Sequence, residues 1–336
     1  MNTQKIQFQQ IRDFGQVFNA GFAFMRGHFF RIFRYLLSIG GPFLLVGVGV
    51  TALLMIRMQS WSTSVNTGGG VLPFAWTDFG ITYLVNLLSF FVGFVMITAV
   101  INAYIKLYIE SPEVTPNIQL GDVWSQVRKD FFRLAGQLLL VSVFVFGVNI
   151  LFFVSVGAIG ESTISAGAVL LVFFIGFGLF IFLMPYLGGV LTPQIYFGQT
   201  NFFKNISRTF SLVQDNWWMT LGLGFVNTII MSTVFFICFF PFYLIMMISI
   251  VSQISSNPGQ TPDFSSMTVV IVSMIVFMTL GYMATFIIHN VMAAVHYFNL
   301  EERKGGGGLL AKIQSIGSGE NSLKSSIDFY DEEEKY

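Results

Sequence analysis

Three histidines and one cysteine are the side chains of this sequence best suited to bind a metal ion or act as a nucleophile. Cys238 lies inside a long apolar run, and His28 is far from the other two histidines along the chain. His289 and His296 are seven residues apart, which places them on one face of a helix without a carboxylate or cysteine there to complete a ligand set. We expect both to form hydrogen bonds between packed helices, and we expect no catalytic residue, metal or cofactor.

Amide side chains are the other polar groups within the apolar parts of the chain. They are Asn86, Asn102, Gln137, Asn149, Asn227 and Asn290. Amides in lipid find partners on neighbouring helices worth about 0.6–2 kcal/mol each, so these residues, like His289, are expected to lock helices together. The alternative is that they line a groove for a lipid headgroup or a peptide. No Asp, Glu, Lys or Arg is predicted in the middle of a span, which argues against ion-coupled transport.

The composition defines the elements that must position these groups. Of the 336 residues, 54% are hydrophobic and only 10% charged, whereas soluble domains carry about 25% charged residues. This balance excludes a soluble enzyme, a basic nucleic-acid-binding domain and a secreted disulfide scaffold. Since about 20 apolar residues cross a bilayer as a helix, the sequence predicts six spans. They are residues 31–57, 80–109, 132–157, 167–197, 217–251 and 267–298.

The distribution of basic residues predicts the orientation of these spans. Sixteen of the 17 Lys and Arg residues fall in the two terminal regions and in the connections near 106–133 and 204–208. The alternate loops, near 58–78, 157–167 and 252–266, hold only Arg57. Basic loops stay in the cytoplasm. We therefore expect a multi-pass protein of the cytoplasmic (inner) membrane with both termini inside.

Three aromatic pairs, at 29–30, 131–132 and 217–218, follow stretches with the same apolar spacing of i, i+4, i+7 and i+11. This is the apolar stripe of an amphipathic helix, and such a helix lies in the membrane interface with its aromatic residues at headgroup level. The predicted membrane contacts are Phe18, Phe22, Phe29, Leu120, Trp124, Phe131, Ile206, Phe210 and Trp217.

The ends of the second, fourth and sixth spans also correspond, as VINAYIKLY (100–108), VLTPQIYFG (190–198) and VMAAVHYFN (291–299). A unit made of an interfacial helix and a two-span hairpin thus occurs three times, over about 14–110, 118–198 and 202–300. The expected fold is all-α: a transmembrane domain over 1–302 with six helices in three hairpin repeats. Residues 303–336, which include four consecutive glycines and an acidic end, are expected to form a flexible polar cytoplasmic tail.

Three segments resemble a broad family of bacterial six-span proteins related to the membrane module of glycerophosphodiester phosphodiesterases. They are FGQVFNAGFAFMRGHFFRIFRYLL (14–37), FFKNISRTFSLVQDNWWMTLGLG (202–224) and AAVHYFNLEERKGG (293–306). The phosphodiesterase chemistry of those relatives belongs to a separate soluble domain that this chain lacks, so the resemblance implies no catalytic residue.

Two functions remain open from the sequence. In the first, the protein is a non-enzymatic scaffold or accessory subunit of a membrane complex, in contact with membrane lipid and other membrane proteins but with no nucleic acid. In the second, it is a permease-like or lipid-handling transporter with a groove between its hairpins. The sequence favours the first, because transporters usually carry charged or broken-helix signatures within their spans.

Overall fold

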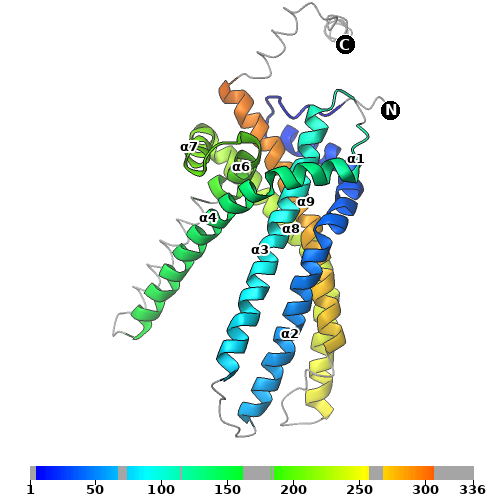
Figure 1. Cartoon of the computed structure of the whole chain (residues 1–336), viewed down its shortest axis with the longest axis vertical. Helices are drawn as coiled ribbons and strands as arrows, with labels where there is room; N and C mark the ends of the chain where they lie inside the picture. The colour runs from blue at the N-terminus through cyan, green and yellow to red at the C-terminus, as the bar shows by residue number, and fades with distance from the viewer. Residues whose placement is uncertain are drawn as a thin grey trace, which may run out of the picture.

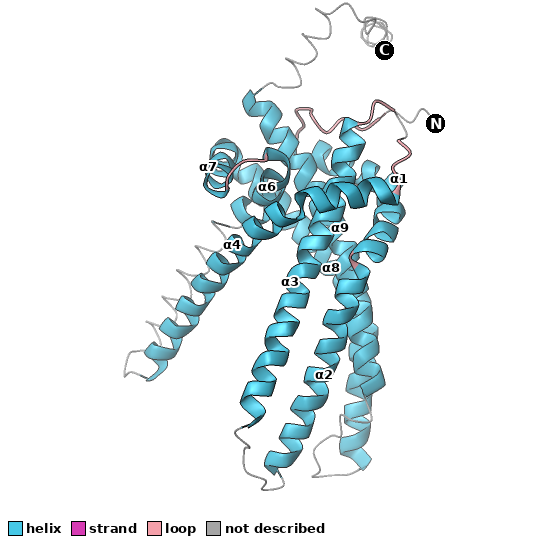
Figure 2. Cartoon of the chain, viewed as in Figure 1, coloured by secondary structure: helices cyan, strands magenta, loops and turns pink. Residues whose placement is uncertain are grey.

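The computed structural model describes residues 5–66, 74–113, 116–161, 183, 185–256 and 268–305, and every regular element there is a helix (Figures 1 and 2). The long helices are α1 (Phe14–Ile39), α2 (Gly41–Asn66), α3 (Phe74–Glu110), α4 (Leu120–Glu161), α8 (Trp217–Ser256) and α9 (Thr268–Gly305). The short ones are the π-helix η1 (Pro185–Leu191), α6 (Thr192–Gly198), α7 (Phe202–Val213) and the 3-10 turn η2 (Gln214–Asn216). The predicted all-α class is confirmed.

Three helical stretches are long and apolar enough to cross a membrane: Gly80–Glu110, Phe202–Ser256 and Val269–Gly305. The pair formed by α1 and the first part of α2, bent by 62° at Gly40, makes a fourth if it counts as one broken span. The predicted span 132–157 lies within α4, and most of the predicted span 167–197 lies outside the described residues, as does the tail from residue 306 onward. The chain is therefore a helical protein with several apolar helices compatible with a membrane.

Two prolines lie where helices begin, and a third lies inside a helix. At the bend, Leu44 N–H still bonds to Gly40 O at 3.2 Å, but Pro42 has no N–H to give and interrupts the ladder. The helix therefore bends near residue 40, later than the start of the predicted span at 31. Pro193 lies in the first turn of α6, where the missing N–H costs nothing. Pro241, in contrast, lies inside the continuous helix α8.

The centre of the molecule is formed where α3, α6 and α9 end. These three helices contact one another. With the end of η1, they bury an almost unbroken set of side chains: Val100, Ile101, Tyr104, Ile105, Val190, Leu191, Ile195, Tyr196, Val291, Met292, Ala294 and Val295. The amphipathic helices surround this centre. Helix α1 contacts α3 and α9, α4 contacts α3 and α6, and α7 contacts α6 and α9. Below the centre, α4 leaves the other helices (Figure 1).

The segment 5–13 is also part of this centre. Phe8 is buried with its ring 5.2 Å from that of Phe24. Arg12 is buried too, and its guanidinium donates to the backbone oxygens of Phe8, at 3.1 Å, and of Gln7. Burial lowers the pKa of Arg12. The Arg12 backbone N–H donates to Asn299 Oδ1 at 2.8 Å, which fastens the segment to the end of α9.

Candidate functional site

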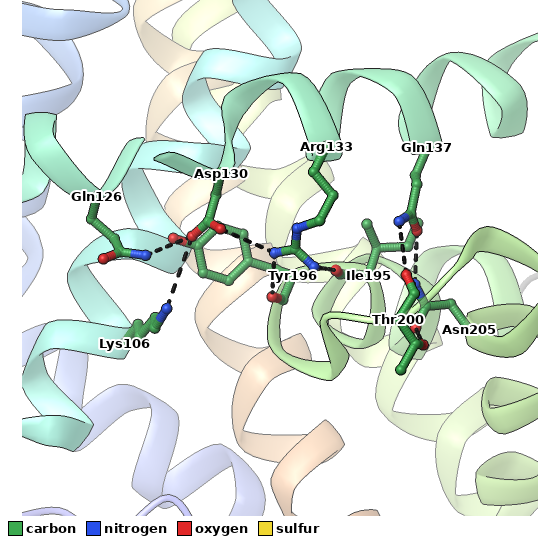
Figure 3. A network of polar contacts seen from close by, with 9 residues as sticks. All are labelled: Lys106, Gln126, Asp130, Arg133, Gln137, Ile195, Tyr196, Thr200 and Asn205. Carbon is green, nitrogen blue, oxygen red and sulfur yellow. Dashed lines mark hydrogen bonds and ion pairs between the residues drawn. The ribbon is translucent and has the colours of Figure 1, made fainter. Parts of the chain in front are cut away.

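A polar network joins α3, α4 and α6 around Asp130 (Figure 3). Its carboxylate accepts hydrogen bonds from Gln126 Nε2 at 2.6 Å and Arg133 Nη2 at 3.2 Å. Lys106 Nζ of α3 completes the set at 4.0 Å. Gln126, Asp130 and Arg133 share one face of α4, since residues three and four apart are neighbours on a helix. Two cations therefore balance the charge of a carboxylate that is almost fully buried, and the Gln126 amide adds a hydrogen bond.

Arg133 also fastens α4 to the end of α6. Its Nη1 donates to Ile195 O at 3.1 Å and its Nη2 to Tyr196 O at 3.0 Å. The last carbonyls of a helix have no partner within it and carry partial negative charge, so a guanidinium there both satisfies and stabilises them. The chain then turns back at Gln199, whose φ of 50° lies in the left-handed region.

A second amide cluster connects α4 to the start of α7 (Figure 3). Asn205 is fully buried and donates to Gln137 Oε1 at 2.7 Å and Thr200 O at 3.1 Å. Gln137 Nε2 in turn donates to Thr200 O at 3.0 Å, and Gln194 Nε2 of α6 donates to Asn205 Oδ1 at 3.1 Å. These contacts fix α4, α6 and the start of α7 relative to one another, while Gln194 Oε1 is buried without a hydrogen-bond partner among the described residues.

The end of α9 carries the remaining ion pairs. Arg208 of α7 binds Glu301 through two contacts, Nε to Oε1 at 3.1 Å and Nη2 to Oε2 at 2.7 Å. Lys304 lies 3.2 Å from Asp215, and Arg303 lies 3.8 Å from Asp13 at the start of α1. Helices α1, α7 and α9 are thus tied together outside the apolar centre.

The predicted in-span amides form hydrogen bonds with neighbouring helices. Asn86 Nδ2 of α3 donates to Thr51 Oγ1 of α2 at 2.7 Å. Asn102 Nδ2 of α3 donates to Asn290 Oδ1 of α9 at 3.2 Å, in a buried contact. Asn227 of α8 pairs with His289 of α9. Asn149 lies in α4, but its side chain is outside the described residues.

Each histidine contacts a polar side chain on another helix. Nδ1 of His28 lies 2.7 Å from the Tyr104 hydroxyl. The His289 ring is 2.9 Å from Asn227 Nδ2, and the His296 ring is 2.9 Å from Thr220 Oγ1. Across the described ranges of the chain, no group of three or more His, Cys, Asp or Glu side chains could hold a metal ion.

The predicted membrane contacts divide into two groups. Phe22, Trp124 and Phe210, at equivalent places in the three stripes, are 42%, 37% and 42% exposed, and Leu120 is exposed as well. The others are half-buried against their own or a neighbouring helix: Phe18, Phe29, Phe131, Ile206 and Trp217. The next stripe position, Met25, Val127 or Val213, is buried in every copy. The stripe therefore straddles the boundary between the protein core and the surface.

The second residue of each aromatic pair is exposed to nearly the same extent in all three helices. Phe30, Phe132 and Trp218 are 81%, 83% and 80% exposed. Each follows a half-buried ring, because consecutive residues on a helix point about 100° apart. Three large apolar rings with equal exposure stand out in equivalent positions of α1, α4 and α8.

A small and a large cavity among the described helices bear on the site. A small one of about 60 Å³ is lined by α1, η1, α8 and α9 and includes Asn227, His289 and His296. A large one of about 1170 Å³ lies between α2, α3, α4, α8 and α9 and is lined mostly by Leu, Phe and Met side chains. None of the predicted amides whose side chains the structure describes lines the large cavity.

Sequence reasoning missed the Asp130 network and the buried Arg12. The i, i+3 and i, i+4 spacing of Gln126, Asp130 and Arg133 was a readable signal, because it places them on one helix face. No comparable signal pointed to Lys106, which comes from another helix, or to the carbonyls of α6.

Comparisons with protein-family models, curated proteins and solved structures give no match to this chain.

Proposed function

We propose that the chain is a multi-pass protein of the cytoplasmic membrane that acts as a scaffold or accessory subunit of a membrane complex. The observation that carries the proposal is the use of its polar groups: the described in-span amides and histidines are bonded to neighbouring helices. Polar pairs of this kind fix helices relative to one another. A transport pathway needs polar groups that face a water-filled route.

We also propose that six spans form three hairpin repeats with both termini inside. The uneven distribution of basic residues supports the orientation. Support for the repeat comes from the contacts, because each amphipathic helix touches the last helix of its own unit and that of the preceding unit in a closed cycle.

The junctions between units support the repeat independently. The residue six positions beyond the first aromatic is Tyr35, Gln137 or Leu223. Tyr35 donates to Ile118 O at 2.8 Å, and Gln137 donates to Thr200 O at 3.0 Å, in both cases just before the next amphipathic helix. In the third copy, a Cβ on Gly222 would lie 3.1 Å from Cε2 of Phe14, at the start of α1. Two junctions use the same position and the third, at Gly222, lies one residue earlier in its copy; together they favour a head-to-tail ring.

The resemblance to the membrane module of glycerophosphodiester phosphodiesterases is consistent with an accessory role, since that module acts beside a separate catalytic domain. The exposed rings Phe30, Phe132 and Trp218 suit contact with lipid headgroups. Membrane lipid and other membrane proteins are thus the proposed partners.

Purification of the full chain in mild detergent tests the scaffold proposal. We expect another membrane protein to co-purify in near-equal amount, and we expect that protein to be depleted from membranes of cells that lack the chain. A chain that purifies with lipid alone, and whose loss changes no other membrane protein, contradicts a scaffold role.

Cysteine labelling tests the orientation separately. In a Cys238→Ala background, Ser62→Cys should be labelled from outside and Ser318→Cys should be protected until the membrane is permeabilised. The reverse pattern would overturn the topology.

A second candidate function, lipid handling, is favoured by one specific observation. The cavity of about 1170 Å³ lies among the apolar helices and involves all three proposed units. It exceeds the roughly 300–1,000 Å³ of ordinary small-molecule pockets. The same purification decides between the candidates, because a lipid-handling protein retains defined lipids without a stoichiometric protein partner.

A further inference from the structure

The large cavity lies in the middle of the apolar helices. Its lining runs from Leu84 to Phe94 on α3 and from Met274 to Tyr282 on α9, with contributions from α2, α4 and α8. Just beyond Phe94 and Tyr282, the side chains of Val95, Ile97 and Met283 are buried in the core. The cavity is therefore closed toward the end of the molecule where α3 and α9 finish, which is called the inner end after the proposed orientation.

The three aliphatic hydroxyl groups of the lining donate to carbonyls of their own helices. Thr51 Oγ1 donates to Gly47 O, Ser142 Oγ to Leu138 O and Thr279 Oγ1 to Ile275 O, each at 2.8 Å. The Tyr282 ring packs on Phe286 with centroids 4.5 Å apart. The rest of the lining is Leu, Ile, Val, Phe and Met.

This chemistry decides which occupant fits. A peptide segment carries backbone N–H and C=O groups that need partners in an apolar site, and each unpaired group costs several kcal/mol. A polar solute or a cluster of water molecules meets the same penalty. A hydrocarbon chain has no polar group to satisfy and gains contact with every wall.

We propose that this cavity binds the acyl chains of a membrane phospholipid, with the headgroup directed away from the packed inner end and toward the outer ends of α3 and α9. The proposal rests on the membrane assignment above and specifies the ligand of the lipid-handling candidate. Its volume of about 1170 Å³ suits long flexible chains, and its closed inner end leaves the outer end or the side as the route of access.

Neighbouring leucines on α4 provide a matched test. Leu139 and Leu140 are both 49% exposed, but only Leu139 lines the cavity. The full-length protein is incubated in vesicles containing a phospholipid with a photoreactive diazirine in its acyl chain, and labelled peptides are identified by mass spectrometry. Leu139→Trp should reduce labelling of the cavity-lining peptides of α3 and α9 by about threefold or more, because the indole projects into the cavity and displaces part of the acyl chain. Leu140→Trp should leave that labelling within about twofold of the parent chain.

Equal labelling in the two variants, or labelling by a photoreactive free fatty acid but not by the phospholipid, overturns the proposal. Met278→Trp, which narrows the cavity from α9, replaces Leu139→Trp if the latter does not give the size-exclusion profile of the parent chain. Labelling of α1 and the start of α4 reports membrane insertion. Labelling of α1 and α4 without labelling of the cavity refutes only the binding of acyl chains in the cavity. A chain that is missing from the membrane fraction refutes the membrane assignment.

Discussion

Helix α3 passes through two different surroundings, although its sequence is apolar along almost its whole length. In its N-terminal half, called the outer half after the proposed orientation, Ile81 is 62% exposed, and Leu84 and Leu88 are similarly open. In its inner half, Ile97, Ile101 and Ile105 are completely buried. Helix α9 follows the same pattern, from the exposed Val269 to the buried Val291.

The outer and inner halves of the whole molecule differ most in their polar contacts. The inner half holds the Asp130 network, the Asn205 cluster and the ion pairs at the end of α9. The outer half holds an apolar cavity and mainly hydroxyl groups that bond back to their own helix. Lipid tails are as apolar as leucine, so inside a bilayer the hydrophobic effect does not drive helices together, and close packing and polar pairs hold them instead. Polar pairs therefore specify the inner assembly, and the outer half remains open.

Isoleucines in the two halves should differ most in their effect on stability. Ile101→Ala removes a fully buried side chain and should cost about 2–5 kcal/mol of unfolding free energy, through lost burial and a residual void. Ile81→Ala, on the same helix, should change it by about 0.5 kcal/mol or less. Unfolding in mixed micelles measures both. Equal costs would show that the outer half is as tightly packed as the inner half.

The next largest effect should come from the Asp130 network. Arg133→Ala removes two hydrogen bonds that join α4 to α6 and one to Asp130 within α4, and it leaves two carbonyls at the end of α6 without their donor. We expect a loss of about 2–3 kcal/mol, because Arg133 is partly open to solvent and a fully buried pair would cost more. The exposed neighbour Lys129→Ala is the control. A cost for Arg133→Ala no greater than that of the control would argue against an anchoring role.

A smaller effect is expected from the amide pair between α3 and α9. Asn102→Leu should cost about 0.6–2 kcal/mol, the usual value of an interhelical amide bond in a membrane protein. A double-mutant cycle with Asn290→Leu separates the pair from the individual residues. A coupling energy indistinguishable from zero would mean that the hydrogen bond between them does not hold the helices together.

The smallest difference is expected within one aromatic pair. Phe131 is half-buried against the core and Phe132 is 83% exposed. Phe131→Ala should therefore destabilise the protein by about 1 kcal/mol more than Phe132→Ala. In the vesicle experiment, the loss of Phe132 should instead reduce acyl-chain labelling at the start of α4. If Phe132→Ala were the more destabilising change, the side of α4 that carries Phe132 would face the protein core and not the membrane.

The sequence by itself determined the helical class, the apolar segments and the amphipathic spacing. Helix periodicity and composition are local properties, and they placed Phe22, Trp124 and Phe210 at equivalent positions before any contact was known. It also predicted that the amides and His289 would bind other helices, because apolar surroundings give such groups few other partners.

Only the tertiary structure decided which apolar residues are buried and where the cavity lies. A leucine that faces lipid and a leucine that faces protein have the same hydropathy, so Leu84 and Leu138 cannot be told apart by type. The Asp130 network likewise depends on Lys106 and on the carbonyls of Ile195 and Tyr196, which come from other helices. Such contacts depend on how the ends of separate helices pack together, which the spacing of residues within one helix does not indicate.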